Sequence, residues 1–142
     1  MSEYITLEDI DRVTSMIRER SSYQPRVGII LGSGLSPLAD EVGSPDVIPY
    51  SDLAGWPVST VHGHRGRLVI GTLEGQTVCV MQGRSHYYEG YSMSLIGLPV
   101  RVMNRLGIEI LIVTNAAGAI NPEFQPGDLM RIIDHLPDVK DR

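Results

Sequence analysis

Hydrophobic residues recur at helical spacing in two parts of the chain. Near the start, Thr6 precedes a stripe of apolar residues three or four positions apart, which predicts a helix capped by Thr6; the stripe is Ile10, Val13 and Ile17. A second helix is predicted from Ser94 to Leu106, with a kink at Pro99 and a stop at Gly107. A short third helix is expected to begin at Ser36-Pro37, with Ser36 as its N-cap.

Continuous apolar runs predict the strands, and a polar turn around Glu74-Gly75-Gln76 predicts a hairpin. The expected strands are Val27–Leu31, Arg67–Leu73, Thr77–Gln82, Ile110–Val113 and Asp128–Ile133. Residues 47–57 show an irregular pattern. Wholly apolar strands joined by helices indicate an α/β fold with a mixed, largely buried sheet flanked by helices. So few helices leave such a sheet short of cover, which a partner subunit or further sequence would have to supply.

Composition narrows the class of protein. The chain has 142 residues, 42% of them hydrophobic and 20% charged, which fits one globular domain over residues 1–142. Its net charge of −5 argues against nucleic acid as a partner. Cys79 is the sole cysteine, so no intramolecular disulfide can form and a reducing compartment is expected. With no signal peptide pattern and no apolar run near the roughly 20 residues that span a membrane, the expected location is the cytoplasm.

Two glycine- or alanine-rich breaks follow apolar strands, which is where ligands collect in open α/β sheets. Gly32-Ser33-Gly34 comes before the short helix, so backbone N–H groups, the Ser33 hydroxyl and the helix N-terminus could hold an anion. Asn115-Ala-Ala-Gly118 repeats the arrangement, and the two breaks could face one crevice. A close-packed turn without a ligand explains each break as well.

Histidine, arginine and tyrosine side chains gather in the loop after the hairpin. Arg84 offers a planar fork for phosphate oxygens, His86 can exchange a proton near neutral pH, and Tyr88 could pack on a sugar. A solvated loop with a stacked aromatic residue is the alternative. His62 and His64 raise the possibility of zinc with His86 as a third ligand, but no acidic residue stands beside the pair and contact with phosphate or a sugar hydroxyl is favoured.

Taken together, these segments resemble the purine nucleoside phosphorylases, in particular the trimeric class that acts on 6-oxopurine nucleosides. The resemblance extends over nearly the whole chain, in the order of the family, through Ile30–Leu35, Ser59–Val69, Met81–Tyr91, Val113–Gly118 and Pro126–His135. It implies a purine/uridine phosphorylase-like fold. It also implies phosphorolysis, in which a purine nucleoside and phosphate give the free base and ribose 1-phosphate.

The resemblance also assigns roles to particular residues. Phosphate would be held by Ser33, His64, Arg84, His86 and the backbone at Ala116. His64 and His86 are the catalytic candidates, and Tyr88 would contact the ribose. Inorganic phosphate would be the co-substrate, with no metal or organic cofactor, and the expected assembly is a homotrimer.

In that family, the chain continues past Asp134-His135 for about another half-length that supplies the base-binding residues. We therefore expect this chain to be the N-terminal portion, with phosphate and ribose contacts but no base pocket, and inactive by itself. Three alternatives stay open at this stage: a methylthioadenosine phosphorylase, a non-catalytic phosphate- or sugar-phosphate-binding module that could pair with a full-length subunit, and a fragment that folds poorly.

Overall fold

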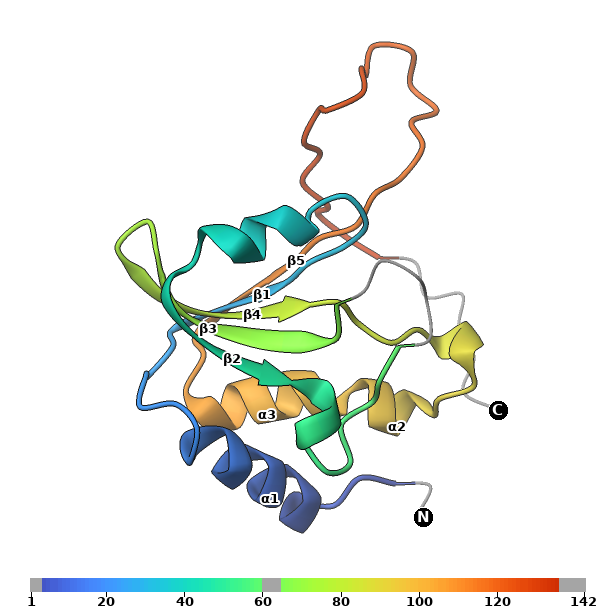
Figure 1. The fold of residues 1–142 in the computed structure, drawn as a ribbon. Coiled ribbons are helices and arrows are strands. Elements are labelled where there is room, and N and C mark those ends of the chain that lie inside the picture. Colours follow the sequence, from blue (N-terminus) through green and yellow to red (C-terminus); the bar gives the residue numbers. More distant parts are fainter. Residues whose placement is uncertain (1–3, 60–64, 136–142) are drawn as a thin grey trace.

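A computed structural model describes residues 4–59 and 65–135 of the chain (Figure 1). Its centre is a mixed sheet with the strand order β2-β3-β4-β1-β5. The strands are β1 (Val27–Ile30), β2 (Gly43–Pro49), β3 (Arg67–Leu73), β4 (Gln76–Gln82) and β5 (Ile110–Val113). The helices are α1 (Leu7–Arg18), α2 (Met93–Ile96) and α3 (Leu98–Leu106), with 3₁₀ helices η1 (Ser36–Glu41), η2 (Tyr50–Asp52) and η3 (Tyr87–Glu89).

Strand direction divides the sheet into two parts. β1 pairs in parallel with β4 on one side and β5 on the other. β3 pairs antiparallel with both β2 and β4, and β3 and β4 form the predicted hairpin. Glu74 and Gly75 both have positive φ in its turn, at 48° and 73°, which is the geometry of a two-residue hairpin connection.

Alternate residues of each strand build two apolar cores, one on either face of the sheet. On one face, Ile30, Leu68 and Cys79 pack with α1 and α3. On the other, Ile29 and Val80 pack beneath η1 and the residues that follow it. Figure 1 shows this layering, with α1 and α3 on one side of the sheet and η1 on the other. Both faces are covered over β1 and β4, which explains why apolar residues stand at consecutive positions in these strands, at Ile29 and Ile30 and from Val78 to Met81.

The two main helices begin where local chemistry favours it. Thr6 caps α1 as predicted, because its hydroxyl accepts from the Asp9 N–H while the Asp9 carboxylate accepts from the Thr6 N–H. The predicted second helix is divided into α2 and α3 at Gly97, and Pro99 occupies the first turn of α3. Proline lacks an N–H and is tolerated in a first turn, so the kink lies just ahead of it. Among the described residues, no helix is long and apolar enough to cross a bilayer.

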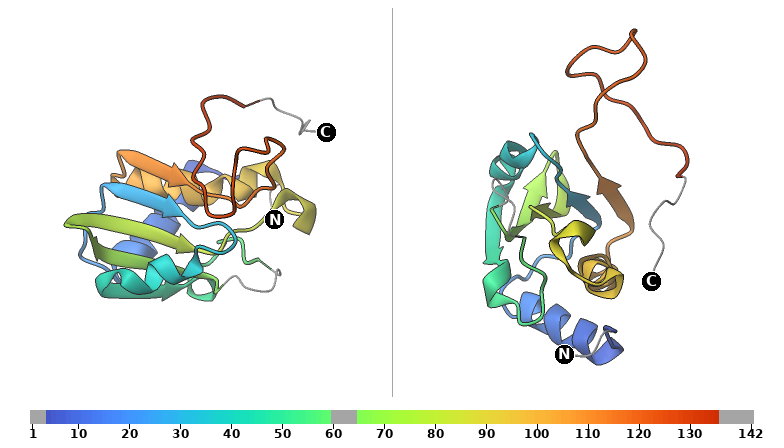
Figure 2. Two further views of the ribbon diagram at one scale, coloured as in Figure 1. Left: turned by 90° about the horizontal axis from the view of Figure 1, so that it is seen from above. Right: turned by 90° about the vertical axis from the view of Figure 1, so that its right-hand side faces the viewer.

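One predicted strand is absent and one strand was not predicted. Residues 128–133 form no strand, and the stretch described as irregular contains the end of β2. The segment after β5 instead extends away from the sheet (Figures 1 and 2), with Leu129 and Ile133 almost fully exposed at 96% and 88%. β5 itself is poorly covered on both faces, since Ile110 and Val113 point to opposite faces and are each 57% exposed. The expected shortage of cover is therefore concentrated at β5.

Candidate functional site

The parallel strands end together at one edge of the sheet. Ile30 of β1 is level with Met81 of β4 and Val113 of β5. The turns that leave these strands consequently start side by side. The two small-residue breaks therefore follow neighbouring strand ends, and the Arg84 loop leaves from the same edge, while a crevice shared by the two breaks stays a prediction.

The turns after β1 and β5 pack backbone against backbone. A Cβ atom on Gly32 would lie 2.5 Å from the Thr114 carbonyl oxygen and 2.7 Å from the Asn115 Cα, so only glycine fits. The Gly32 N–H donates to the Thr114 hydroxyl at 2.9 Å, and that hydroxyl donates to the Ile30 carbonyl at 3.0 Å. Close packing thus accounts for Gly32, while Ser33 and Ala116 remain exposed at this edge.

The helix after Gly34 differs from the prediction. η1 is a 3₁₀ helix of six residues, its N-cap is Leu35, and no side chain caps it. Ser36 lies inside the helix, where its hydroxyl accepts a hydrogen bond from Gln82. The predicted N-cap at Ser36 is therefore wrong. So short a 3₁₀ helix offers little dipole, and a contribution of its N-terminus to anion binding stays a prediction.

Arg84 reaches from the end of β4 to the turn after β5. Its Nη1 donates to the Thr114 carbonyl at 2.8 Å, so the guanidinium lies against the residue that also holds Gly32. The preceding residue is fixed as well, because the buried Tyr50 hydroxyl donates to the Gly83 carbonyl at 2.7 Å. Burial raises the pKa of Tyr50 far above its ordinary value, so this hydroxyl stays a protonated donor. Ser33, Arg84 and Ala116 are thereby brought to one edge of the sheet.

His86 is held by a carboxylate that the sequence analysis missed. Glu89 accepts from the His86 backbone N–H at 2.7 Å, and the His86 Nδ1 lies 2.9 Å from the same oxygen. The Ser59 hydroxyl donates to the same carboxylate, at 3.1 Å to the nearer oxygen. The Glu89 side chain is only 3% exposed. The three-residue spacing of a capping box was the signal that could have identified it.

Tyr88 is 74% exposed but does not lie loose in solvent. Its ring stacks on the His86 ring at a centroid separation of 4.9 Å and an interplanar angle of 15°. Tyr91 anchors the far end of the loop, since its hydroxyl donates to the Val58 carbonyl at 2.6 Å. The loop therefore contains a stacked aromatic pair, as expected for the alternative of a solvated loop. It also contains polar contacts that fix His86.

His62 and His64 lie outside the described residues, so the zinc alternative and the role expected of His64 rest on the sequence. Within residues 4–59 and 65–135, no group of three or more histidine, cysteine or acidic side chains is placed to hold a metal ion. Cys79 is buried in β4 with a free thiol, and burial raises its pKa to about 12.

Comparison with known proteins shows the family of the chain. The sequence profile of the phosphorylase superfamily matches residues 26–142, which include every segment of the sheet edge just described. The chain belongs to the phosphorylase superfamily. Its resemblance to purine nucleoside phosphorylases is also confirmed by individual relatives and solved structures, as follows.

Purine nucleoside phosphorylase 1 of Geobacillus stearothermophilus is 58% identical over 127 residues, covering 89% of this chain and 46% of that protein. The purine nucleoside phosphorylase of Rattus norvegicus is 46% identical over 136 residues, covering 96% and 47%. A crystal structure of the Schistosoma mansoni purine nucleoside phosphorylase with inosine superposes with a TM-score of 0.79 at 44% identity, covering 90% of this chain and 44% of that one. A purine nucleoside phosphorylase with ribose-1-phosphate gives a TM-score of 0.81 at 45% identity, covering 90% and 46%.

This phosphorylase-superfamily chain thus spans about half the length of the curated relatives it matches. The mixed sheet and its flanking helices correspond to the matching part of the solved structures, so the expected fold class is confirmed.

Proposed function

We propose that this chain carries the phosphate- and ribose-contacting part of a purine nucleoside phosphorylase, which converts a purine nucleoside and phosphate into the free base and ribose 1-phosphate. The observation that carries the proposal is the contact of the Arg84 guanidinium with Thr114. It places a permanent positive charge at the edge where the Ser33 and Ala116 turns emerge. The relatives named for this activity support the same assignment.

The residue types suit the reaction. Phosphate is already an anion, so it needs positioning and charge complementarity more than a strong base. Arg84 offers the fork that binds phosphate oxygens, and the exposed Ser33 and Ala116 turns add a hydroxyl and backbone N–H groups. When the His86 Nδ1–H donates a hydrogen bond to the Glu89 carboxylate, Nε2 is the ring nitrogen that exchanges a proton with phosphate. Glu89 would thus fix the ring orientation that the reaction uses.

Other parts of the proposal follow the family likeness. His64 would join the phosphate and ribose contacts, and Tyr88 would pack on the ribose. Phosphate would be the co-substrate without a metal or organic cofactor, and the working assembly would be a homotrimer. A cytoplasmic location stays a prediction from the single cysteine. We assign purine recognition to none of the residues described above.

Phosphate affinity of an Arg84→Met variant tests the proposal. A charged hydrogen bond contributes about 1.5–3 kcal/mol, so the dissociation constant for phosphate should rise about tenfold to a hundredfold in isothermal titration calorimetry. Arg20→Met is the matched control, because Arg20 lies between α1 and β1 at the amino end of that strand and its removal changes the net charge equally. Equal affinities for the two variants would contradict the assignment. Phosphate-dependent release of hypoxanthine from inosine then tests the reaction itself.

A further inference from the structure

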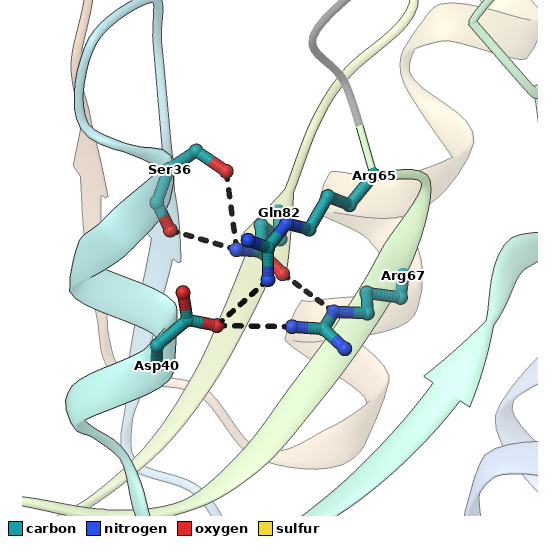
Figure 3. Close-up of polar contacts among 5 residues, drawn as sticks. All are labelled: Ser36, Asp40, Arg65, Arg67 and Gln82. Carbon is teal, nitrogen blue, oxygen red and sulfur yellow. Dashed lines mark hydrogen bonds and ion pairs between the residues drawn. The ribbon is translucent and has the colours of Figure 1, made fainter.

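Gln82 is a fully buried polar residue at the last position of β4. Its side chain is 0% exposed, yet all of its amide atoms have partners. The Nε2 donates to the Ser36 carbonyl at 2.7 Å and lies 3.1 Å from the Ser36 hydroxyl. The Oε1 accepts from the Arg67 Nε at 2.5 Å. Figure 3 shows the amide between these two partners, which come from η1 and β3.

The same contacts continue to the far end of η1. The Arg67 Nη2 donates to the Asp40 carboxylate at 3.0 Å, and the Arg65 Nη1 donates to the same oxygen at 3.0 Å. Gln82, Ser36, Asp40 and Arg67 therefore close a ring of contacts that spans η1, β3 and β4 (Figure 3). The Asp40 end is partly exposed, so the buried Gln82 end is the part that water cannot replace.

The hydrogen bonds of Gln82 contribute only modest net stability, because folding exchanges bonds to water for bonds within the protein. An apolar residue of similar volume would fill the space but would leave the Ser36 carbonyl and the Arg67 Nε without this partner. What Gln82 adds is a fixed geometry, since a fully paired buried amide allows one arrangement of its neighbours.

The neighbours of Gln82 belong to the site already described. Arg84 follows two residues later in the chain, and Ser36 follows Ser33 by three. The Ser33 turn closes through the Leu35 N–H donating to the Gly32 carbonyl at 3.2 Å. Thr114 holds this turn at Gly32, and Gln82 holds it at Ser36.

We propose that Gln82 is a positioning residue that fixes the Ser33 turn relative to Arg84 by holding the start of η1 against the end of β4. This inference rests on the proposed function for its consequence in phosphate binding. The structural part, a turn held at both ends, stands on the contacts alone. Without Gln82, η1 keeps the Asp40 contacts to Arg65 and Arg67, but its first residue loses its link to the end of β4. Ser33 is then held less firmly relative to the guanidinium.

The test uses Gln82→Met, which keeps the volume and removes the hydrogen bonds to Ser36 and to Arg67. Amide hydrogen exchange should accelerate about tenfold at Leu35 and Leu38, whose N–H groups close the Ser33 turn and the first turn of η1. The phosphate dissociation constant should also rise about tenfold. Thr14→Val is the matched control, because it removes another buried side-chain hydrogen bond, from the Thr14 hydroxyl to the Ile10 carbonyl in α1.

Unchanged exchange at Leu35 and Leu38 in Gln82→Met overturns the inference, as does equal acceleration in Thr14→Val. If wild-type protein binds no phosphate, the proposed function fails while the exchange rates still decide the structural part. Should Gln82→Met not fold, Gln82→Glu keeps the Arg67 partner and removes the donor to the Ser36 carbonyl. The same acceleration is then expected, and its absence counts against the proposal.

Discussion

Replacing Gly32 by alanine tests the backbone packing on which the candidate site depends. The new methyl group would lie 2.5 Å from the Thr114 carbonyl oxygen, whereas contacts of Cβ atoms below 3.0 Å are essentially never seen. The turns after β1 and β5 must therefore separate by about half an ångström. The contacts with Thr114 and Asn115 are both with backbone atoms, so no side chain can rotate away to relieve them.

The expected loss of stability combines several contributions. Overpacking costs about 1–3 kcal/mol. Separating the turns also weakens the hydrogen bond from the Gly32 N–H to the Thr114 hydroxyl, which adds about 1 kcal/mol. Alanine restricts the unfolded chain and recovers about 0.4–1 kcal/mol. We expect Gly32→Ala to lower the free energy of unfolding by about 1–3.5 kcal/mol.

Urea denaturation followed by tryptophan fluorescence measures this difference. Trp56 is the sole tryptophan and is 5% exposed in the core, so its emission reports global unfolding. Gly118→Ala is the matched control, because a Cβ atom there meets nothing within 4 Å and the expected change is within about 0.5 kcal/mol. If the two variants unfold at the same urea concentration, the packing of the two turns does not constrain the site and the reasoning is refuted.

Two further predictions concern buried groups. Glu89→Ala removes the acceptor of His86 and Ser59, so the free energy of unfolding should fall by about 2–4 kcal/mol and phosphate should bind more weakly; unchanged stability in urea would show that the carboxylate does not hold the loop. Burial raises the pKa of Cys79 from 9.0 to about 12, so the folded protein retains a proton that the unfolded chain loses as the pH rises above 9. Between pH 9 and 12 the free energy of unfolding should therefore fall with pH in wild type more steeply than in Cys79→Ala. The two slopes should differ by about 1.4 kcal/mol per pH unit, and parallel profiles would contradict the prediction.

β1 and β4 could be predicted because both of their faces are covered. β1 and β4 carry apolar residues at consecutive positions, a pattern that survives without any knowledge of their neighbours. β2 contains Pro45 and Asp46 and buries only Ile48, and it could not be recognised because edge strands tolerate such residues. Residues 128–133 have a strand-like pattern, but a strand also needs a partner, which sequence periodicity does not reveal.

For the candidate site, the sequence predicted the turns but not their mutual contacts. The breaks at Gly32 and Asn115 are visible as small residues after apolar runs, whereas their backbone contact depends on β1 and β5 pairing in parallel. Glu89 was missed because one of its partners is the backbone N–H of His86. That N–H faces the carboxylate only once η3 has formed. Gln82 looked like the polar end of a strand, and only the position of η1 above it gives the amide a function.

The central claim is that phosphate binds where the turns after β1, β4 and β5 meet. Titration of the ¹⁵N-labelled chain with inorganic phosphate, followed by amide chemical shifts, tests it most directly. The account predicts saturable shifts at Ser33, Arg84 and Ala116, with α1 unaffected. Shifts that do not saturate, or that are spread over α1 as strongly as over these turns, would contradict it.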